Sequence, residues 1–248
     1  MSLRPLPSSR VWAAWSVALF SGAMAMQLAH FAYRDLPRPQ PLAELSYYPS
    51  GVALRPATLG HAESAADLAW LRAVQYYGGH RLGDNQFVKM EHVFTILTSL
   101  SPHFIPAYVF GGFALAQEGR DFPAAERLML AGLDSNPTSG ELAFELGFLY
   151  YVKPGERDLR NAARYFEQAS RQPDAPAEAA RFAAFSRQQS GDLAVAYELW
   201  SNVRLHSPNV YLREMAQEKM NEIESAIETG RREAAVHRLS TPRVLIRR

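Results

Sequence analysis

Apolar residues recur every three or four positions from about Ala65 to Ile227, the spacing that places them on one side of a helix. No stretch of useful length alternates apolar and polar residues, as a half-buried strand would. Glycine, proline and aspartate interrupt the helical pattern at regular intervals, so it predicts a series of short helices. The body of the chain is therefore expected to be all-α.

The interruptions repeat along the chain. One predicted helix begins with alanines after Gly119-Arg120-Asp121 and ends at Asn136-Pro137. Another begins after Gly191-Asp192, also with alanine near its start, and ends at Ser207-Pro208. A third helix start of the same kind is predicted at Asp158-Leu159-Arg160-Asn161-Ala162. Because each segment has the length of one helix, the spacing indicates a repeated pair of helices.

The helices between these segments carry small residues in matching places. One contains Leu146-Gly147, a weaker copy has Tyr108 and Gly112, and the last has Ala183-Ala184. Together with the repeated openings, these residues resemble the tetratricopeptide repeat, a helix-turn-helix unit of about 34 residues. The resemblance implies a helical solenoid over residues 65–208, with three clear units, one degenerate unit, and close helix contacts at the small residues.

The N-terminal part of the chain has a different character. Residues 11–33 contain no Asp, Glu, Lys or Arg, and at about 1.5 Å per residue they reach roughly 34 Å, enough to cross the hydrocarbon core of a bilayer. This stretch predicts a transmembrane helix, with residues 1–10 in the cytoplasm. Ala23-Met24-Ala25 leaves a second interpretation open, a signal peptide that is cleaved there. Either interpretation exports the remainder of the chain.

Three more segments lie outside the predicted solenoid. Residues 34–64 are rich in proline and are expected to form an extended linker. Residues 209–230 keep spaced apolar positions and are expected to form a capping helix. Residues 231–248 form a basic tail that could bind anionic lipid headgroups or an acidic partner, or could only improve solubility. The arginines of this tail are Arg231, Arg232, Arg238, Arg243, Arg247 and Arg248.

No pattern of catalytic residues is found. The chain lacks a Gly-rich phosphate loop and the H-E-x-x-H and G-x-S-x-G motifs. It has no cysteine, which excludes disulfides and thiolate metal sites, and its net charge of +1 gives no field that favours nucleic acid. His80 and His92 are interpreted as surface or packing residues. We therefore expect no enzymatic activity, no cofactor and no metal.

In the tetratricopeptide family, the first helix of each unit lines the concave face of the solenoid. Phe113, Phe148 and Phe185 stand at equivalent positions of these helices. They form either an aromatic floor for an apolar strand or helix of a partner, or a core shared between units. The candidate partner-binding residues on this face are Phe113, Phe144, Glu145, Phe148, Tyr151, Arg181, Phe185 and Gln188.

The predicted membrane helix has small residues four positions apart, at Ala14, Ala18 and Gly22. A row of this kind permits close packing against another membrane helix, although a simple Ala-rich anchor has the same composition. The row is therefore a candidate surface for packing within a membrane.

These features favour a non-catalytic scaffold, assembly factor or accessory subunit of a membrane or envelope complex. The alternatives are a cleaved, soluble periplasmic peptide-binding module and an accessory domain that works with a partner enzyme. The expected partners are proteins, with no role for nucleic acid. The chain is expected to be a single-pass membrane protein whose body lies in the periplasm or another extracytoplasmic space.

Overall fold

A computed structural model describes residues 9–35 and 51–240. The chain divides into two units, one containing α1 (Ser9–Asp35) and the other containing α2 to α11. Neither described range contains a strand, so the predicted all-α class is confirmed.

Helix α1 exposes its apolar side chains between positions 15 and 31, where its side chains are described. Leu19, Phe20 and Met26 are each more than two-thirds exposed, at 72%, 71% and 78%. Among the residues that the structure describes, no helix combines the length and the apolar character that a membrane crossing requires.

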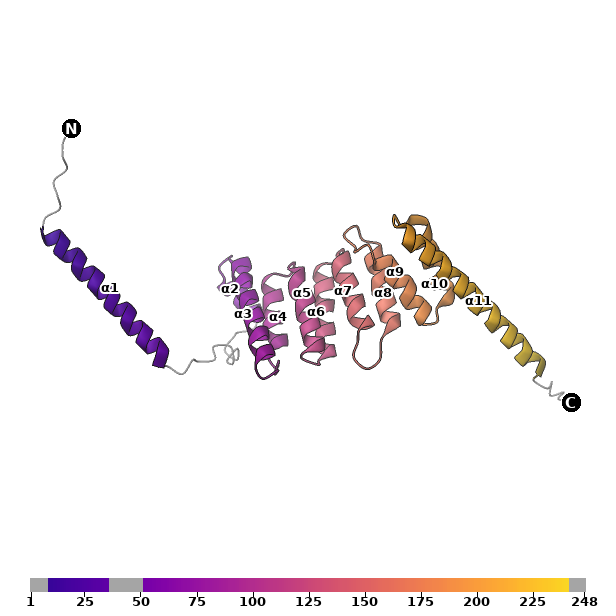
Figure 1. Cartoon of the computed structure of the whole chain (residues 1–248), viewed down its shortest axis with the longest axis horizontal. Helices are drawn as coiled ribbons and strands as arrows, with labels where there is room; N and C mark the ends of the chain where they lie inside the picture. The colour runs from indigo at the N-terminus through magenta and orange to yellow at the C-terminus, as the bar shows by residue number, and fades with distance from the viewer. Residues whose placement is uncertain (1–8, 36–50, 241–248) are drawn as a thin grey trace, which may run out of the picture. The chain divides into compact units, whose positions relative to one another are not determined.

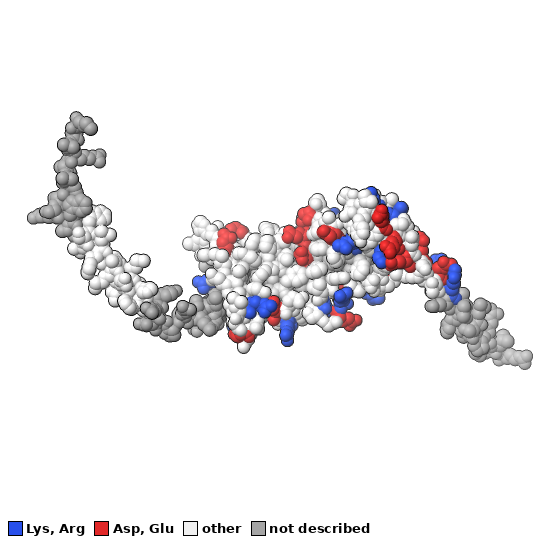
Figure 2. Space-filling model, in the orientation of Figure 1, with Lys and Arg blue, Asp and Glu red and all other residues white. Residues whose placement is uncertain are grey.

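The second unit is built from helices that lie side by side in chain order (Figure 1). From α3 to α11, consecutive helices pack against each other. In addition, α2 packs against α4, α4 against α6 and α5 against α7. In the view of Figure 2, the middle and upper surface over α3 to α6 has few charged side chains, with charges of both signs along its lower edge, and charges of both signs gather over α9 to α11. The helices are α2 (Gly51–Ala57), α3 (Ala62–Leu82), α4 (Met90–Leu100), α5 (Ile105–Gln117), α6 (Phe122–Ser135), α7 (Gly140–Tyr151), α8 (Leu159–Ser170), α9 (Ala179–Gln189), α10 (Leu193–His206) and α11 (Val210–Ser240).

Aspartates fix the start of α6, which pairs with α5, and of α8, which pairs with α7. Asp121 precedes α6 and accepts a hydrogen bond from the backbone N–H of Ala124 at 3.0 Å. Asp158 precedes α8 and accepts one from the backbone N–H of Asn161 at 3.1 Å. These side chains satisfy N–H groups that the first turn of a helix leaves unpaired, so they define where the helix begins.

Glycine permits the closest contacts between paired helices. A Cβ atom added to Gly147 of α7 would lie 2.8 Å from Cδ1 of Phe166 and 3.1 Å from the backbone oxygen of Ala162, both on α8. A Cβ atom added to Gly112 of α5 would lie 2.7 Å from Cγ of Met129 on α6. Because a close-packed interior has no room for such an atom, a larger residue would push the helices apart. The expectation of small residues at these helix contacts is confirmed.

Hydrogen bonds between turns connect successive helix pairs. The Asn136 side-chain Nδ2 donates to the carbonyl oxygen of Pro102 at 2.8 Å, and the backbone N–H of Gly140 donates to Oδ1 of Asp174 at 2.8 Å. The bond from Gly140 is the main reason that the pKa of Asp174 is lowered. Each of these two bonds joins residues 34 positions apart, so the pairs follow one another with a regular spacing.

The C-terminal helix α11 closes the buried core at its end of the unit. Its residues Ala216, Met220 and Ile223 are buried against Trp200 and Val203 of α10. Full burial of an apolar side chain stabilises a fold by about 1.5–3 kcal/mol. These contacts therefore hold the first half of α11 firmly to the body.

The structure differs from the expected segment boundaries in two places. Residues 51–64, expected to belong to an extended linker, instead contain α2 and the start of α3, because α2 packs against α4 and buries Gly51 beside Ser99. Helix α11 continues to Ser240, so the first part of the expected basic tail is helical. Apolar spacing alone did not reveal either extension, since the first depends on a tertiary contact and the second has a mostly polar sequence.

We predict opposite effects of the same substitution at two helical glycines. Gly147→Ala should lower the free energy of unfolding by about 1–3 kcal/mol, because the new methyl group must displace Phe166. Gly78→Ala in α3 should raise it by about 0.5–1 kcal/mol, because the added Cβ has no atom within 4 Å and alanine favours a helix over glycine. Denaturant unfolding followed by circular dichroism measures both values. Equal shifts in the two variants would contradict the close contact between α7 and α8.

Candidate functional site

A row of aromatic side chains runs across α3, α5, α7 and α9, the first helices of successive pairs. Every ring in this row is partly exposed, neither enclosed in the core nor free in solvent. The rings belong to Trp70 and Tyr77 on α3, Phe110 and Phe113 on α5, Phe144, Phe148 and Tyr151 on α7, and Phe182 and Phe185 on α9. We call this set the aromatic face.

Phe182 joins the rings of α7 to those of α9. Its centroid lies 5.7 Å from that of Phe144, 6.2 Å from that of Phe148 and 5.7 Å from that of Tyr151, with each pair of rings close to perpendicular. Edge-to-face pairs contribute about 0.5–1.5 kcal/mol each beyond the area that they bury. The rings of the two helices therefore hold one another in a fixed arrangement.

The row continues towards the N-terminal helices of the body. The ring centroid of Phe113 lies 6.0 Å from that of Phe148. On the same helix, Phe110 lies 5.6 Å from Trp70 and 5.1 Å from Tyr77. Because Phe110 and Phe113 are three positions apart, they share one side of α5. The aromatic face thus extends from α3 to α9 without a gap in the succession of helices.

A hollow opens in the aromatic face between α3, α5 and α7. Its volume is about 590 Å³, within the range of ligand pockets in proteins. Most of its lining is apolar, and its charged residues are both glutamates. The lining residues are Trp70, Tyr77, Pro106, Val109, Phe110, Phe113, Ala114, Gln117, Glu118 and Glu141. We call it the apolar hollow.

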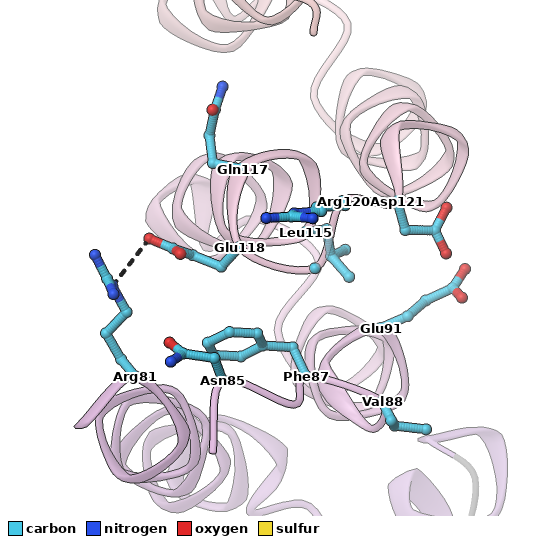
Figure 3. Close-up of a pocket in the computed structure, with 11 residues that line it drawn as sticks. Arg81, Asn85, Phe87, Val88, Glu91, Leu115, Gln117, Glu118, Arg120 and Asp121 are labelled. Atoms are coloured by element: carbon cyan, nitrogen blue, oxygen red, sulfur yellow. Dashed lines mark ion pairs between the residues drawn. The ribbon is translucent and has the colours of Figure 1, made fainter. Parts of the chain in front are cut away.

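A second hollow of about 830 Å³ lies at the turns that follow α3 and α5. It shares Glu118 with the apolar hollow, and Nε of Arg81 lies 3.2 Å from Oε1 of Glu118 on one side of it (Figure 3). Glu91 and Asp121 lie on the opposite side (Figure 3). Charges of both signs are therefore mixed here, and the geometry favours neither an anion nor a cation. The apolar hollow is the better candidate for a specific ligand.

Two charged side chains accompany the rings. Glu145 of α7 is half-buried, and its burial, followed by the nearby carboxylate of Glu141, raises its pKa. Arg181 of α9 lies with its Cζ atom 4.9 Å from the ring centroid of Phe182. The buried Nε of Arg181 has no hydrogen-bond partner in the part of the chain that the structure describes. Both charges lie where a bound molecule could interact with them.

The structure brings together most of the residues expected to bind a partner. Phe113, Phe144, Phe148, Tyr151 and Phe185 all belong to the aromatic face. Glu145 and Arg181 stand beside these rings on the same helices, α7 and α9. Both the floor and the polar groups of the expected site are thus present on adjacent helices.

Gln188 already has partners within the fold. Its side-chain oxygen accepts a hydrogen bond from Nε1 of Trp200 at 2.9 Å, and its Nε2 donates to Glu222 at 3.3 Å. It therefore connects α9 to α10 and α11. We assign this side chain a structural role.

Four rings of the aromatic face were not predicted from the sequence, namely Trp70, Tyr77, Phe110 and Phe182. Phe182 follows Phe148 by 182 − 148 = 34 positions, the same separation as the hydrogen bonds between turns. This spacing was a usable signal for Phe182. For the rings of α3 and α5, the sequence offered no equivalent signal, because their role depends on how these helices are rotated in the fold.

The small residues of α1 remain uncovered within the described chain. Ala18 is exposed, and a Cβ atom added to Gly22 would have no atom within 4 Å. The side chain of Ala14 lies outside the described side chains.

The basic tail is described only in part. Arg231 and Arg232 are exposed on α11, and NH2 of Arg232 lies 2.5 Å from Oε1 of Glu228. The side chain of Arg238 is not among the described side chains, and Arg243, Arg247 and Arg248 lie outside the described residues.

His80 contacts neighbouring side chains and is not part of a group of metal ligands among the described residues. Its Nδ1 lies 2.6 Å from Oδ1 of Asp84, and its ring centroid lies 4.3 Å from that of Tyr76. Within the residues covered by the structure, no group of three or more histidines and carboxylates could hold a metal ion.

No protein-family model matches this chain, and a search of curated proteins finds no match. The interpretation of the aromatic face therefore depends on its own geometry and charges.

We predict that Glu145→Gln stabilises the protein at pH 7. The folded state raises the pKa of Glu145, so the ionised side chain opposes folding at any pH above that raised value. The gain in the free energy of unfolding should shrink as the pH falls through the raised pKa and vanish below the ordinary glutamate value of about 4.3. Denaturant unfolding at a series of pH values measures this difference. Glu178→Gln, at an exposed carboxylate before α9, is the control and should change stability by less than about 0.5 kcal/mol.

Proposed function

We propose that this chain is a non-catalytic scaffold whose aromatic face binds a segment of a partner protein in a membrane or envelope complex. The observation that carries this proposal is the row of partly exposed rings across α3, α5, α7 and α9. Such a row leaves apolar surface in water, and removing apolar surface from water drives association. Because the rings already hold one another, little conformational freedom is lost when a partner binds.

The proposed framework is a solenoid of the tetratricopeptide type. Its support is the order of the helix pairs along the chain, the hydrogen bonds between turns 34 positions apart, and the glycines at the contacts between paired helices. In such a framework, the first helix of each unit faces the concave side, and the aromatic face is that concave surface. A concave surface can enclose an extended or helical segment of a partner.

We also propose that α1 anchors the protein in a membrane, with the body on the extracytoplasmic side. The support is the absence of charged residues between Val11 and Tyr33 and the exposed apolar side chains of α1. This assignment uses the sequence of the whole stretch, of which the structure describes the side chains from position 15 to position 31. In this arrangement, the row of small residues on α1 packs against a neighbouring membrane helix. The basic tail binds acidic groups of lipid or protein.

Substitution on the aromatic face should separate binding from folding. Phe148→Ala removes a partly exposed ring, and Arg181→Glu reverses a charge beside it, so each should reduce the recovery of partner proteins more than it lowers the melting temperature. Co-purification of the tagged chain in mild detergent, followed by mass spectrometry, measures recovery. Leu97→Ala truncates a side chain of α4 that is 0% exposed in the core and serves as the control, with a lower melting temperature but normal recovery. Large destabilisation by Phe148→Ala with unchanged recovery would show that the rings only hold the fold together.

The anchor is tested by reporters joined to the C-terminus. Alkaline phosphatase, which becomes active only after export, should be active, and green fluorescent protein, which fluoresces when it folds in the cytoplasm, should be dark. Replacing residues 1–35 by a Met should reverse both readings. A membrane-bound product that retains residues 1–25 supports the anchor, whereas a soluble product without them supports the cleaved binding module. Activity of the reporters only in the cytoplasm would overturn the proposed location.

A further inference from the structure

We infer that the apolar hollow binds a segment of a partner protein in which a basic residue stands among apolar ones, and that Glu141 and Glu145 of α7 receive its positive charge. This inference rests on the proposed function and specifies the chemistry of the partner. It follows from the placement of rings and carboxylates on α3, α5 and α7.

The apolar part of the segment is indicated by the shape and lining of the hollow. Trp70, Phe110 and Phe113 line the hollow together with the aliphatic side chain of Val109. Phe110 is held edge-on against Trp70, with an angle of 77° between the rings, so part of this lining is ordered before a ligand arrives. A volume of about 590 Å³ admits several apolar side chains of a peptide. A polar segment would leave its hydrogen-bonding groups without partners over these rings.

The charge of the segment is indicated by which of the two glutamates that line the hollow already has a partner within the fold. Glu118, at the edge of the hollow, has two partners through Oε1, with Nε of Arg81 at 3.2 Å and the hydroxyl of Tyr77 donating at 3.3 Å. Glu141 also lines the hollow, and it is exposed. Between these two carboxylates, Glu141 is therefore the one that can receive a cation from a ligand.

Glu145 strengthens this preference for a cation. It follows Glu141 by four positions on α7, so the two carboxylates lie on the same side of the helix and repel each other. Burial together with that repulsion raises the pKa of Glu145, as expected for a carboxylate without a neutralising cation. A lysine or arginine of a bound segment would relieve the repulsion and pair with both groups.

The same pair of carboxylates would discriminate against acidic segments. A partner carboxylate at this position would add a third negative charge beside Glu141 and Glu145, and like charges brought together in a partly buried site are strongly disfavoured. Arg181 lies beside Phe182 on α9, the next helix of the aromatic face after α7. There its guanidinium can bind an acidic group of the same segment. The aromatic face therefore distinguishes partners by the position of a charge as well as by apolar character.

The experiment uses the full-length chain in detergent micelles and three pools of nonapeptides with blocked ends. The pools are randomised among Leu, Phe, Val, Tyr and Ser at all positions except the central one, which is Lys, Gln or Glu. Retention of peptides on the immobilised chain should be about tenfold higher for the Lys pool than for the Gln pool, and lowest for the Glu pool. Raising the salt concentration should reduce the preference for Lys without removing the binding of the Gln pool.

The double variant Glu141→Gln and Glu145→Gln should bind the Lys and Gln pools equally, while Glu156→Gln, at an exposed position of the turn before α8, should behave as the unchanged protein. If no pool binds the unchanged protein, the proposed function itself fails. If all three pools bind equally, or if the preference for Lys survives in the double variant, the face binds peptides but the inference about charge is overturned. If a peptide of residues 241–248 displaces the Lys pool and the chain dimerises with rising concentration, the occupant is a second copy of this chain, which also overturns the inference.

Discussion

Close approach of paired helices at small residues is the constraint on which the rest of this fold depends. At Gly132 of α6, an added Cβ atom would lie 2.8 Å from Cδ1 of Tyr108 and 2.9 Å from Cδ2 of Leu142, so this one position contacts both the preceding and the following helix of the row. A larger residue there would separate all three helices. At such positions the side chain that fills the contact comes from the neighbouring helix, as Phe166 does at Gly147 and Met129 does at Gly112.

Helix α7 shows how this constraint produces a binding surface. Gly147 faces α8, and the next residue, Phe148, points to the aromatic face and contacts Phe113, Tyr151 and Phe182. A change of one position along a helix turns a side chain by about 100°, so neighbouring residues serve different surfaces. The requirements for packing and for recognition are thus met by adjacent positions of one helix, and the rings are held in place by the same packing that closes the core.

Neither charge beside the aromatic face forms an ion pair within the described residues. Glu145 is half-buried with a raised pKa, and the buried Nε of Arg181 lacks a hydrogen-bond partner among the described residues. Elsewhere in the body some charges are paired, as in the contacts of Arg187 with Glu167 at 2.5 Å and with Asp192 at 2.9 Å, although the buried Nε of Arg204 also lacks a hydrogen-bond partner among the described residues. Local departures from good packing and pairing concentrate at sites that bind other molecules, which agrees with the proposed role of this face.

The sequence by itself determined the features that depend on local physics. These are the all-α class, from the spacing of apolar residues, the turns that begin with Asp121 and Asp158, and the small residues at helix contacts such as Gly147. Only the tertiary structure decided that Phe110 of α5 contacts Trp70 and Tyr77 of α3 and that Gln188 is held by Trp200. It also decided that α2 packs against α4. Such contacts join different helices, and they depend on how each helix is rotated against its neighbour, which local apolar spacing does not specify.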